Sequence, residues 1–352
     1  MKKSDKEEVK SLWKKCFNDS DEFIDLYFRR RYYDDINMAL FYDDKLISAL
    51  QMIPYEMTFY GEKIRASYIS GAATDPDYRN RGAMAQLLKD SHQRMYEKGV
   101  SLSFLIPAGD GLFDYYSKFG YETIFFSKFI KGGNLALDKD FSLQVELCEE
   151  VDEYIYNYLY DRMLALPSAV LHNYEDLSIV MDDIKLAGGK IVKASRNDSI
   201  CGVSFAVPVE KDVIIKAIIA DSGAIKDAMF SKLLNYFNAD STVYRTFQGD
   251  DLLPYGMARV INVDSLLSLW AKANSDRTIC INLLGDIAIP QNNGLYIITN
   301  GKCYHYDNRF MAHQSGNEEV IKALDRVEEY NINSVVKLLF ENLNPYISLM
   351  MD

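Results

Sequence analysis

Residues 68–99 read YISGAATDPDYRNRGAMAQLLKDSHQRMYEKG, an apolar run followed by a polar turn and then a helical pattern. Four apolar side chains recur at helical spacing and predict one buried face: Met84, Leu87, Leu88 and Met95. Gly99 comes directly after the last turn, where a left-handed residue commonly ends a helix. The stretch therefore predicts a strand, a tight loop and an amphipathic helix.

The loop between this strand and this helix has the composition of an anion site. Arg79, Asn80, Arg81 and Gly82 place two cations and a residue without a Cβ beside the first helical amides. Unsatisfied N–H groups and the positive end of the helix dipole favour a phosphate or pyrophosphate there. A basic residue with a glycine three positions later is common by chance, so this interpretation depends on the neighbouring sequence.

Length and composition indicate the class of protein. With 352 residues the chain is long enough for two or three domains, and 48% apolar and 26% charged residues are typical of a soluble globular protein. No apolar run reaches the roughly 18 residues that span a bilayer, and the N-terminus does not resemble a secretion signal. We therefore expect a cytoplasmic protein.

Neither the cysteines nor the histidines suggest a metal site. The five cysteines are scattered without a CxxC pair, and the four histidines have no ligand spacing. His92 is placed by the pattern on the polar side of the helix, as a solvated residue. The net charge of −12 disfavours nucleic acid and anionic membranes as partners. This charge either attracts a cationic substrate or simply keeps the protein soluble.

The order of elements predicts a mixed sheet in the N-terminal third. Amphipathic helices are expected over residues 4–17 and 21–33, followed by four β segments at residues 38–42, 46–54, 55–60 and 64–73. The hairpin joints are placed at Asp43-Asp44 and Gly61-Glu62. After the helix that follows, a buried strand at 101–107, a short helix at 111–118 and a strand through Phe126 complete the region.

The same order of elements recurs from residue 150 onward with little sequence identity. Its strand-to-helix joint, ADSGAIKD, keeps Gly223 but lacks flanking arginines, so we do not expect it to hold a phosphate. The last hundred residues predict a small α+β domain with a hairpin turn at Asn300-Gly301 and an apolar tail. The predicted domains are 1–133, 134–258 and 259–352.

Two tracts resemble the GNAT superfamily of N-acetyltransferases, which use acyl-CoA. Residues 79–84, RNRGAM, are similar to its Gln/Arg-x-x-Gly-x-Gly/Ala signature, and LIPAGDGLFDYYSKFGYE at 105–122 is similar to its second conserved block. The sixth signature position holds Met84 rather than Gly or Ala, as in the enhanced intracellular survival (Eis) branch. That resemblance implies an α/β (α+β) fold: tandem GNAT domains with mixed, splayed sheets, the second without the motif, plus a sterol-carrier-protein-like C-terminal domain.

The resemblance also implies roles for particular residues. The pyrophosphate of acetyl-CoA would be bound by Arg79, Asn80, Arg81, Gly82 and Ala83. The pantetheine arm would lie along Ala72, Ala73 and Thr74, in the gap between splayed strands. Tyr116 would protonate the departing thiolate, although packing is the alternative role and Tyr115 is its neighbour. The terminal carboxylate of Asp352 would act as general base, reaching back into the N-terminal site.

The implied activity is acetyl transfer from acetyl-CoA to a primary amine by direct attack on the thioester. An aminoglycoside-like polyamine or a lysine side chain would be the acceptor, and the family suggests a hexamer. The alternative is a non-catalytic protein that binds acyl-CoA or lipid. Four residues near the second helix either face the acceptor or form an ordinary cap and apolar stripe: Asp19, Asp21, Phe23 and Tyr27. The sequence does not identify the amine.

Overall fold

The computed structural model describes residues 6–132 and 142–351. By its internal contacts the chain divides into two compact units, each discontinuous in sequence. The first comprises Met1–Asn18, Tyr32–Ile124 and Tyr255–Pro345, and the second comprises Asp19–Arg31, Phe125–Pro254 and Tyr346–Asp352. The domain boundaries after residues 133 and 258 stay a prediction.

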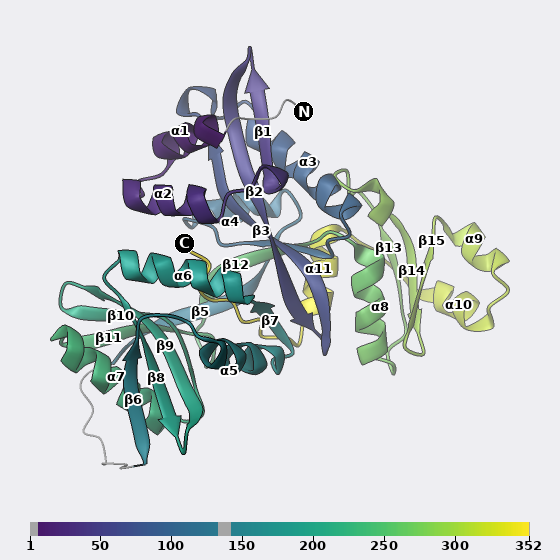
Figure 1. Ribbon diagram of the computed structural model, residues 1–352. Helices are drawn as coiled ribbons and strands as arrows, with labels where there is room; N and C mark the ends of the chain where they lie inside the picture. Colours follow the sequence, from purple (N-terminus) through teal and green to yellow (C-terminus); the bar gives the residue numbers. More distant parts are fainter. Residues whose placement is uncertain (1–5, 133–141, 352) are drawn as a thin grey trace. The chain divides into compact units, whose positions relative to one another are not determined.

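The first unit is built on a mixed sheet (Figure 1). Its strands run in the order β1-β2-β3-β4-β12, with bounds Asn37–Tyr42, Lys45–Phe59, Glu62–Thr74, Leu102–Leu105 and Leu253–Val260. β3 and β4 are parallel, whereas the other neighbours are antiparallel. Helices α1 (Lys6–Cys16), α3 (Ala83–Glu97) and α4 (Gly111–Ser117) belong to this unit.

One strand prediction was wrong. The segments expected at 46–54 and 55–60 form a single strand of 15 residues, β2, in which Pro54 lies opposite Ser67. The strand that leads to the loop is therefore the third strand, not the fourth. The turn that follows β2 is Tyr60-Gly61, both left-handed with φ of 49° and 81°, rather than Gly61-Glu62. Asp43-Asp44, with φ of 47° and 62°, is confirmed as a hairpin turn.

β3 and β4 separate along their length. The ladder joins Ala66, Ser67 and Tyr68 to Leu102, Ser103 and Phe104, and ends there. β3 continues to Thr74 and remains paired with β2 through Ala73 and Thr74. The predicted splay between these strands is therefore present at the end of β3 that leads into the loop.

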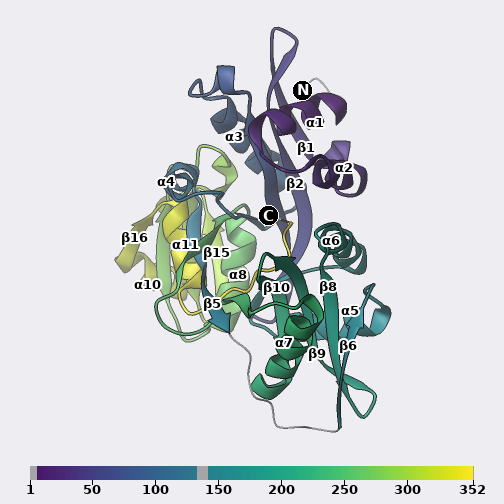
Figure 2. The same ribbon diagram turned by 90° about the vertical axis from the view of Figure 1, so that its left-hand side faces the viewer.

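The second unit contains a sheet in the order β5-β11-β10-β9-β8-β6. The strand bounds are Glu122–Gly132, Ser241–Thr246, Asp212–Ala220, Ser199–Val209, Lys190–Arg196 and Leu143–Cys148. Alternate side chains point to opposite faces: Ile191 and Phe205 pack with α5 (Glu153–Leu164) and α6 (Tyr174–Leu186). Val192 and Ala206 pack with α7 (Gly223–Phe237), which Figure 2 shows beside β8, β9 and β10. Helix α2 (Asp21–Arg30) also belongs here.

Two strands, β5 and β12, do not pair with the strands that precede them in sequence. β5 follows α4, yet its residues 128–132 pair with β11 of the second unit. β12 follows β11, yet its residues 257–260 pair with β4 of the first unit. Periodicity predicts a strand but carries no information on its partner, so the sequence did not predict this exchange. β6, β7 (Ser168–Leu171) and β12 were also missed.

The first unit also contains a small four-stranded sheet, in the order β15-β14-β13-β16 (Figure 1). Its strands are Lys302–Tyr306, Gly294–Thr299, Ile279–Leu283 and Val327–Tyr330. α8 (Val263–Ala273) packs on β14 and β15, and the unit also contains α9 (Arg309–Gln314), α10 (Glu318–Ala323) and α11 (Ile332–Phe340). Asn300 and Gly301 are both left-handed, which confirms the hairpin turn. Within the described residues, no helix is long and apolar enough to cross a bilayer.

Candidate active site

The first turn of α3 is open to an anion. Gly82 is its N-cap residue, with φ 82° and ψ 4°, and no side chain caps the helix amides. Its carbonyl accepts the first helical hydrogen bond, from the Gln86 N–H at 3.0 Å. A Cβ at Gly82 would meet no atom within 4 Å, and the first turn contains no acidic residue. Amides at such a terminus attract a phosphate through both hydrogen bonds and the helix dipole.

Two cations lie near Tyr78, Arg81 of the loop and Lys45 of β2. The Arg81 guanidinium is 5.3 Å and the Lys45 ammonium 4.6 Å from the centroid of the Tyr78 ring. Arg79 turns back instead, and its Nε donates to the Thr74 carbonyl at 3.2 Å. Arg79 therefore braces the start of the loop, while Arg81 adds positive charge beside the open amides.

Asp75 fixes the turn that leads into the loop. Its buried carboxylate accepts from the Asp77 N–H at 3.2 Å and pairs with Lys45 at 3.1 Å and Lys15 at 3.4 Å. Burial alone would raise the pKa of Asp75, but its bonds to Lys45, Asp77 and Lys15 outweigh burial and lower it. The ionised carboxylate is thus stable where the backbone must change direction.

The end of β3 provides an edge beside this loop. Ala73 is buried, and Ala72 and Thr74 are half-buried. The Thr74 carbonyl accepts the Arg79 bond and a contact from the Cys16 thiol at 3.3 Å, and its hydroxyl lies 2.9 Å from Ser48 Oγ. Gly71, with φ 56°, lies where the pairing with β2 shifts register. The predicted pantetheine residues are therefore held firmly in place.

Tyr116 lies on α4 with 8% of its surface exposed. Its ring packs in one apolar cluster with Ile69 of β3 and Leu87 of α3, and Ala72 borders that cluster. Burial, with a smaller contribution from Tyr115, raises the pKa of Tyr116 to about 12. No hydrogen bond to its hydroxyl is found among the residues of the described ranges. A protonated phenol thus lies in the same core as the splayed strand and the helix.

His92 was wrongly predicted to be solvated. It is 1% exposed, and its Nε2 lies 3.2 Å from the Tyr121 hydroxyl, which is 2.8 Å from Ser103 Oγ. Burial, followed by the charge of Arg259, lowers the pKa of His92 well below its ordinary value. Because His92 follows Leu88 by four positions, it lies on the apolar face of α3. This spacing could have predicted that His92 is buried.

A buried ion pair supports the turn after Tyr116. Arg259 donates to the Asp286 carboxylate at 2.6 Å and to the Phe119 carbonyl at 2.7 Å. Gly120, with φ 85°, leaves room for this guanidinium, since a Cβ there would lie 2.0 Å from it. The pattern did not identify this pair, because its members are 27 residues apart in sequence.

The corresponding helix terminus of the second unit is occupied by the chain's own groups. Ser222 caps α7 by accepting from the Ile225 N–H at 3.3 Å. The preceding residue, Asp221, accepts from the Tyr158 hydroxyl at 2.8 Å and pairs with Arg162 at 2.7 Å. A carboxylate and a cap therefore stand where α3 has open amides and arginines. The absence of a phosphate site at α7 stays a prediction.

The residues near α2 form a cap and an apolar stripe. Ser20 accepts from the Phe23 N–H at 3.2 Å, and Tyr27 is 1% exposed with its ring 6.3 Å from that of Phe23. Asp19 and Asp21 are exposed. Asp352, the predicted base, lies outside the described residues. The part of the tail that is described, residues 346–351, belongs to the second unit.

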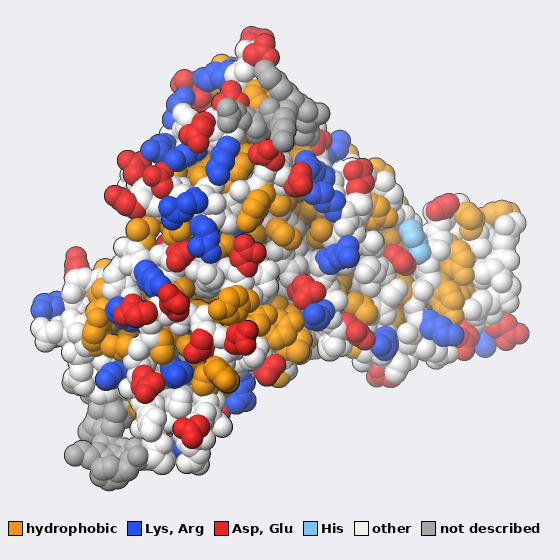
Figure 3. Space-filling model, viewed as in Figure 1, with side chains coloured by type: hydrophobic (Ala, Val, Ile, Leu, Met, Phe, Trp, Pro, Cys, Tyr) orange, Lys and Arg blue, Asp and Glu red, His pale blue; other side chains and the backbone are white. Residues whose placement is uncertain are grey.

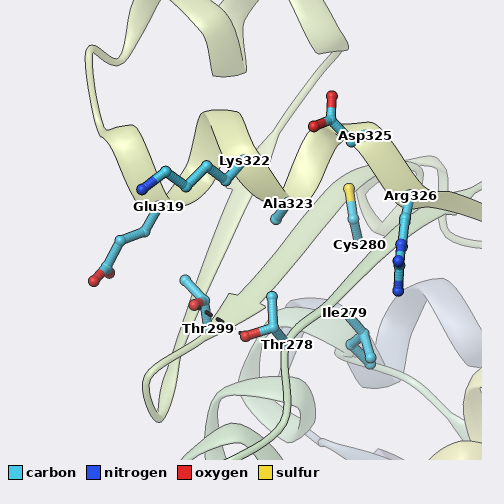
Figure 4. Close-up of a pocket in the computed structure, with 9 residues that line it drawn as sticks. All are labelled: Thr278, Ile279, Cys280, Thr299, Glu319, Lys322, Ala323, Asp325 and Arg326. Atoms are coloured by element: carbon cyan, nitrogen blue, oxygen red, sulfur yellow. Dashed lines mark hydrogen bonds between the residues drawn. The ribbon is translucent and has the colours of Figure 1, made fainter.

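A pocket of about 410 Å³ lies beside the small C-terminal sheet. Glu319 and Lys322 lie at one end of it, and Asp325, Arg326 and the buried Cys280 lie at the other (Figure 4). None of the predicted site residues lines this pocket. Across residues 6–132 and 142–351, no group of three or more His, Cys, Asp and Glu side chains could hold a metal.

Comparison with known proteins agrees with this geometry. Residues 1–124 match the family described as acetyltransferase (GNAT) domain. No curated protein matches the chain.

Three solved structures share the fold at low identity. A probable N-acyltransferase from Enterococcus faecalis has a TM-score of 0.73 and 15% identity, covering 97% of this chain and 88% of its own. A GCN5-related N-acetyltransferase from Anabaena variabilis has a TM-score of 0.73 and 15% identity, with 94% and 86% covered. Eis1 from Mycobacterium abscessus has a TM-score of 0.62 and 13% identity, with 85% and 81% covered. The chain therefore has a GNAT fold, and the match to the acetyltransferase (GNAT) domain family is confined to its first 124 residues.

Proposed function

We propose that this protein transfers an acetyl group from acetyl-CoA to a primary amine. The observation that carries the proposal is the uncapped N-terminus of α3 at Gly82, beside Arg81 and next to the splayed end of β3. The backbone amides of Gly82 and Ala83 and the side chains of Arg79, Asn80 and Arg81 bind the pyrophosphate. Ala72, Ala73 and Thr74 line the pantetheine arm.

The transfer is a direct attack on the thioester. The amine nitrogen forms a bond to the acetyl carbon, the carbon–sulfur bond breaks, and the thiolate leaves with the electron pair. Tyr116 donates a proton to that sulfur, and the Asp352 terminal carboxylate accepts the proton lost by the amine. General acid and base groups each contribute roughly 10²–10⁴-fold. Binding both substrates in one site contributes further through orientation.

The acceptor class is a small polycation, such as an aminoglycoside-like polyamine, or a lysine side chain. The net charge of −12 favours a cationic molecule by long-range attraction. Acidic and basic side chains are interspersed on the face shown in Figure 3, so this attraction is diffuse there. The resemblance to the Eis branch also leads us to propose a homo-oligomer, a hexamer, with a sterol-carrier-protein-like C-terminal domain. Light scattering tests the hexamer.

A second function, binding of acyl-CoA or lipid without catalysis, is favoured by the pocket between β13 and α10. Steady-state release of CoA thiol with a panel of amines separates the two functions. Turnover with at least one amine supports transfer. Measurable acetyl-CoA binding without turnover of any amine supports the binding protein instead.

A further inference from the structure

A buried ion cluster of the second unit lies outside the proposed site. His172 lies between β7 and α6 and is 1% exposed. Its Nδ1 bonds to the carboxylate of Asp176, and its Nε2 lies 2.8 Å from the Ser348 carbonyl oxygen. Asp176 also pairs with Arg31, at the C-terminal end of α2. The cluster therefore joins two helices to the C-terminal tail of the chain.

The two ring nitrogens of His172 have different oxygen partners. Both ring nitrogens face oxygen atoms, one of a carboxylate and one of a carbonyl, and both oxygens are acceptors. A neutral imidazole has a single N–H and satisfies only one of them, whereas an imidazolium donates to both. Burial acts to raise the pKa of Asp176, but His172 and Arg31 outweigh it and lower that pKa. The ionised carboxylate is therefore an acceptor for the His172 ring.

The rest of the tail is also bound by the second unit. The Tyr346 N–H donates to the Ser168 carbonyl at 2.9 Å, and the Val170 N–H donates to the Tyr346 carbonyl at 3.0 Å. Tyr346, Leu349 and Met351 pack on the core formed by α5, α6 and the sheet. Leu349 and Met351 are left-handed, with φ of 58° each, a conformation that costs free energy unless contacts hold it.

We propose that His172, held by the Asp176 carboxylate that also pairs with Arg31, is a latch that fixes the C-terminal tail to the second unit through the Ser348 carbonyl. This gives the second GNAT-like unit, in which the N-terminus of α7 lacks the arginines that precede α3, a role as the platform of the tail. The consequence for catalysis rests on the proposed function, in which the terminal carboxylate is the base. His172 is then a positioning residue, because it acts through the backbone of Ser348.

Hydrogen–deuterium exchange of the full chain tests the latch directly. We expect His172→Ala to accelerate exchange in peptides covering 346–351 by about tenfold or more, since a charge-assisted bond is lost. Peptides from β8, β9 and β10 keep their protection. His172→Gln, which retains one donor, is measured beside it in case the alanine variant unfolds. The exposed His313→Ala is the matched control.

The outcomes separate the latch from the proposed base. Unchanged exchange of the tail in a folded His172 variant overturns the latch, as does equal acceleration throughout the second unit. Selective release of the tail with a lower kcat and an unchanged KM for acetyl-CoA supports both proposals. Selective release with unchanged kcat supports the latch and removes the terminal carboxylate from the reaction.

Discussion

Two adjacent tyrosines of α4 have different surroundings. Tyr116 is buried with its ring against that of Tyr121, at 5.8 Å between centroids, whereas Tyr115 is half-buried and packs on Phe119. Because burial destabilises the phenolate, the pKa of Tyr116 rises to about 12 and the phenol keeps its proton throughout the neutral range. A group that must donate a proton to a departing thiolate benefits from this environment.

Replacing Tyr116 by phenylalanine removes the hydroxyl and retains most of the packing. We expect kcat to fall by roughly 10²–10⁴-fold, with little change in the affinity for acetyl-CoA. Tyr115→Phe is the control and should retain activity. Steady-state kinetics and binding of acetyl-CoA measure both quantities. Unaltered turnover in Tyr116→Phe would remove this residue from the mechanism.

His92 makes the stability of the fold depend on pH. The folded chain holds His92 neutral, so only the unfolded chain gains a proton here as the pH falls through the ordinary value of 6.5. The free energy of unfolding should therefore decrease below about pH 6.5, and the decrease should be smaller in His92→Gln. Denaturant titrations between pH 5 and pH 8 measure the free energy of unfolding of both proteins. The same pH dependence in both proteins would contradict this origin.

At the scale of elements, α3 and α7 both follow strands, but their N-termini differ in charge and capping. α3 begins at an uncapped glycine with arginines before it, whereas α7 begins at a serine that caps its own helix beside a carboxylate. The strand before α3 carries a second constraint at Gly71. A Cβ there would lie 2.2 Å from Trp13 Cζ3 and 2.5 Å from Gln51 Oε1. The edge next to the loop thus depends on a residue without a side chain.

Gly71→Ala should destabilise the first unit. The substitution adds a clash with the Trp13 ring to the cost of a left-handed alanine, together roughly 2–4 kcal/mol. Gly61→Ala is the matched control, because Gly61 has φ 81° but no atom lies within 4 Å of its Cβ position. This variant should lose only the roughly 1 kcal/mol that a left-handed alanine costs. Chemical denaturation measures the free energy of unfolding of each variant. Equal losses in the two variants would contradict the close contact at Gly71.

The elements were predicted better than their pairing. The short helix expected at 111–118 is the observed α4 (Gly111–Ser117), and the left-handed Gly99, with φ 71°, ends α3 as expected. These features depend on local spacing and turn chemistry, which a sequence displays directly. The partners of β5 and β12 and the burial of His92 depend on contacts between distant segments. The roles of the loop residues, of Ala72–Thr74, of Tyr116 and of Asp352 stay predictions.

At the scale of the whole molecule, the chain crosses between its two units several times. The second unit takes α2, β5 and the C-terminal tail from segments that adjoin the first unit in sequence. The second unit, whose described helices α2, α5, α6 and α7 each begin with a side-chain cap, thus binds segments from distant parts of the chain.

Extending the chain beyond Asp352 tests the role of its end. A few added residues convert the terminal carboxylate into an amide, so we expect kcat to fall by roughly 10²-fold or more if it is the base. The same residues added before Met1 are the control. Enzyme kinetics on both proteins give the comparison, and full activity of the C-terminally extended chain would refute the role.

The most direct test of the proposed acyl-CoA site compares the two helix termini by calorimetry. Gly82→Asp places a carboxylate at the start of α3, and Gly223→Asp places one at the start of α7. We predict that the natural chain binds one acetyl-CoA, that Gly82→Asp weakens binding at least tenfold, and that Gly223→Asp leaves it unchanged. Two molecules bound per chain, or loss of binding only in Gly223→Asp, would contradict a single acyl-CoA site at Gly82.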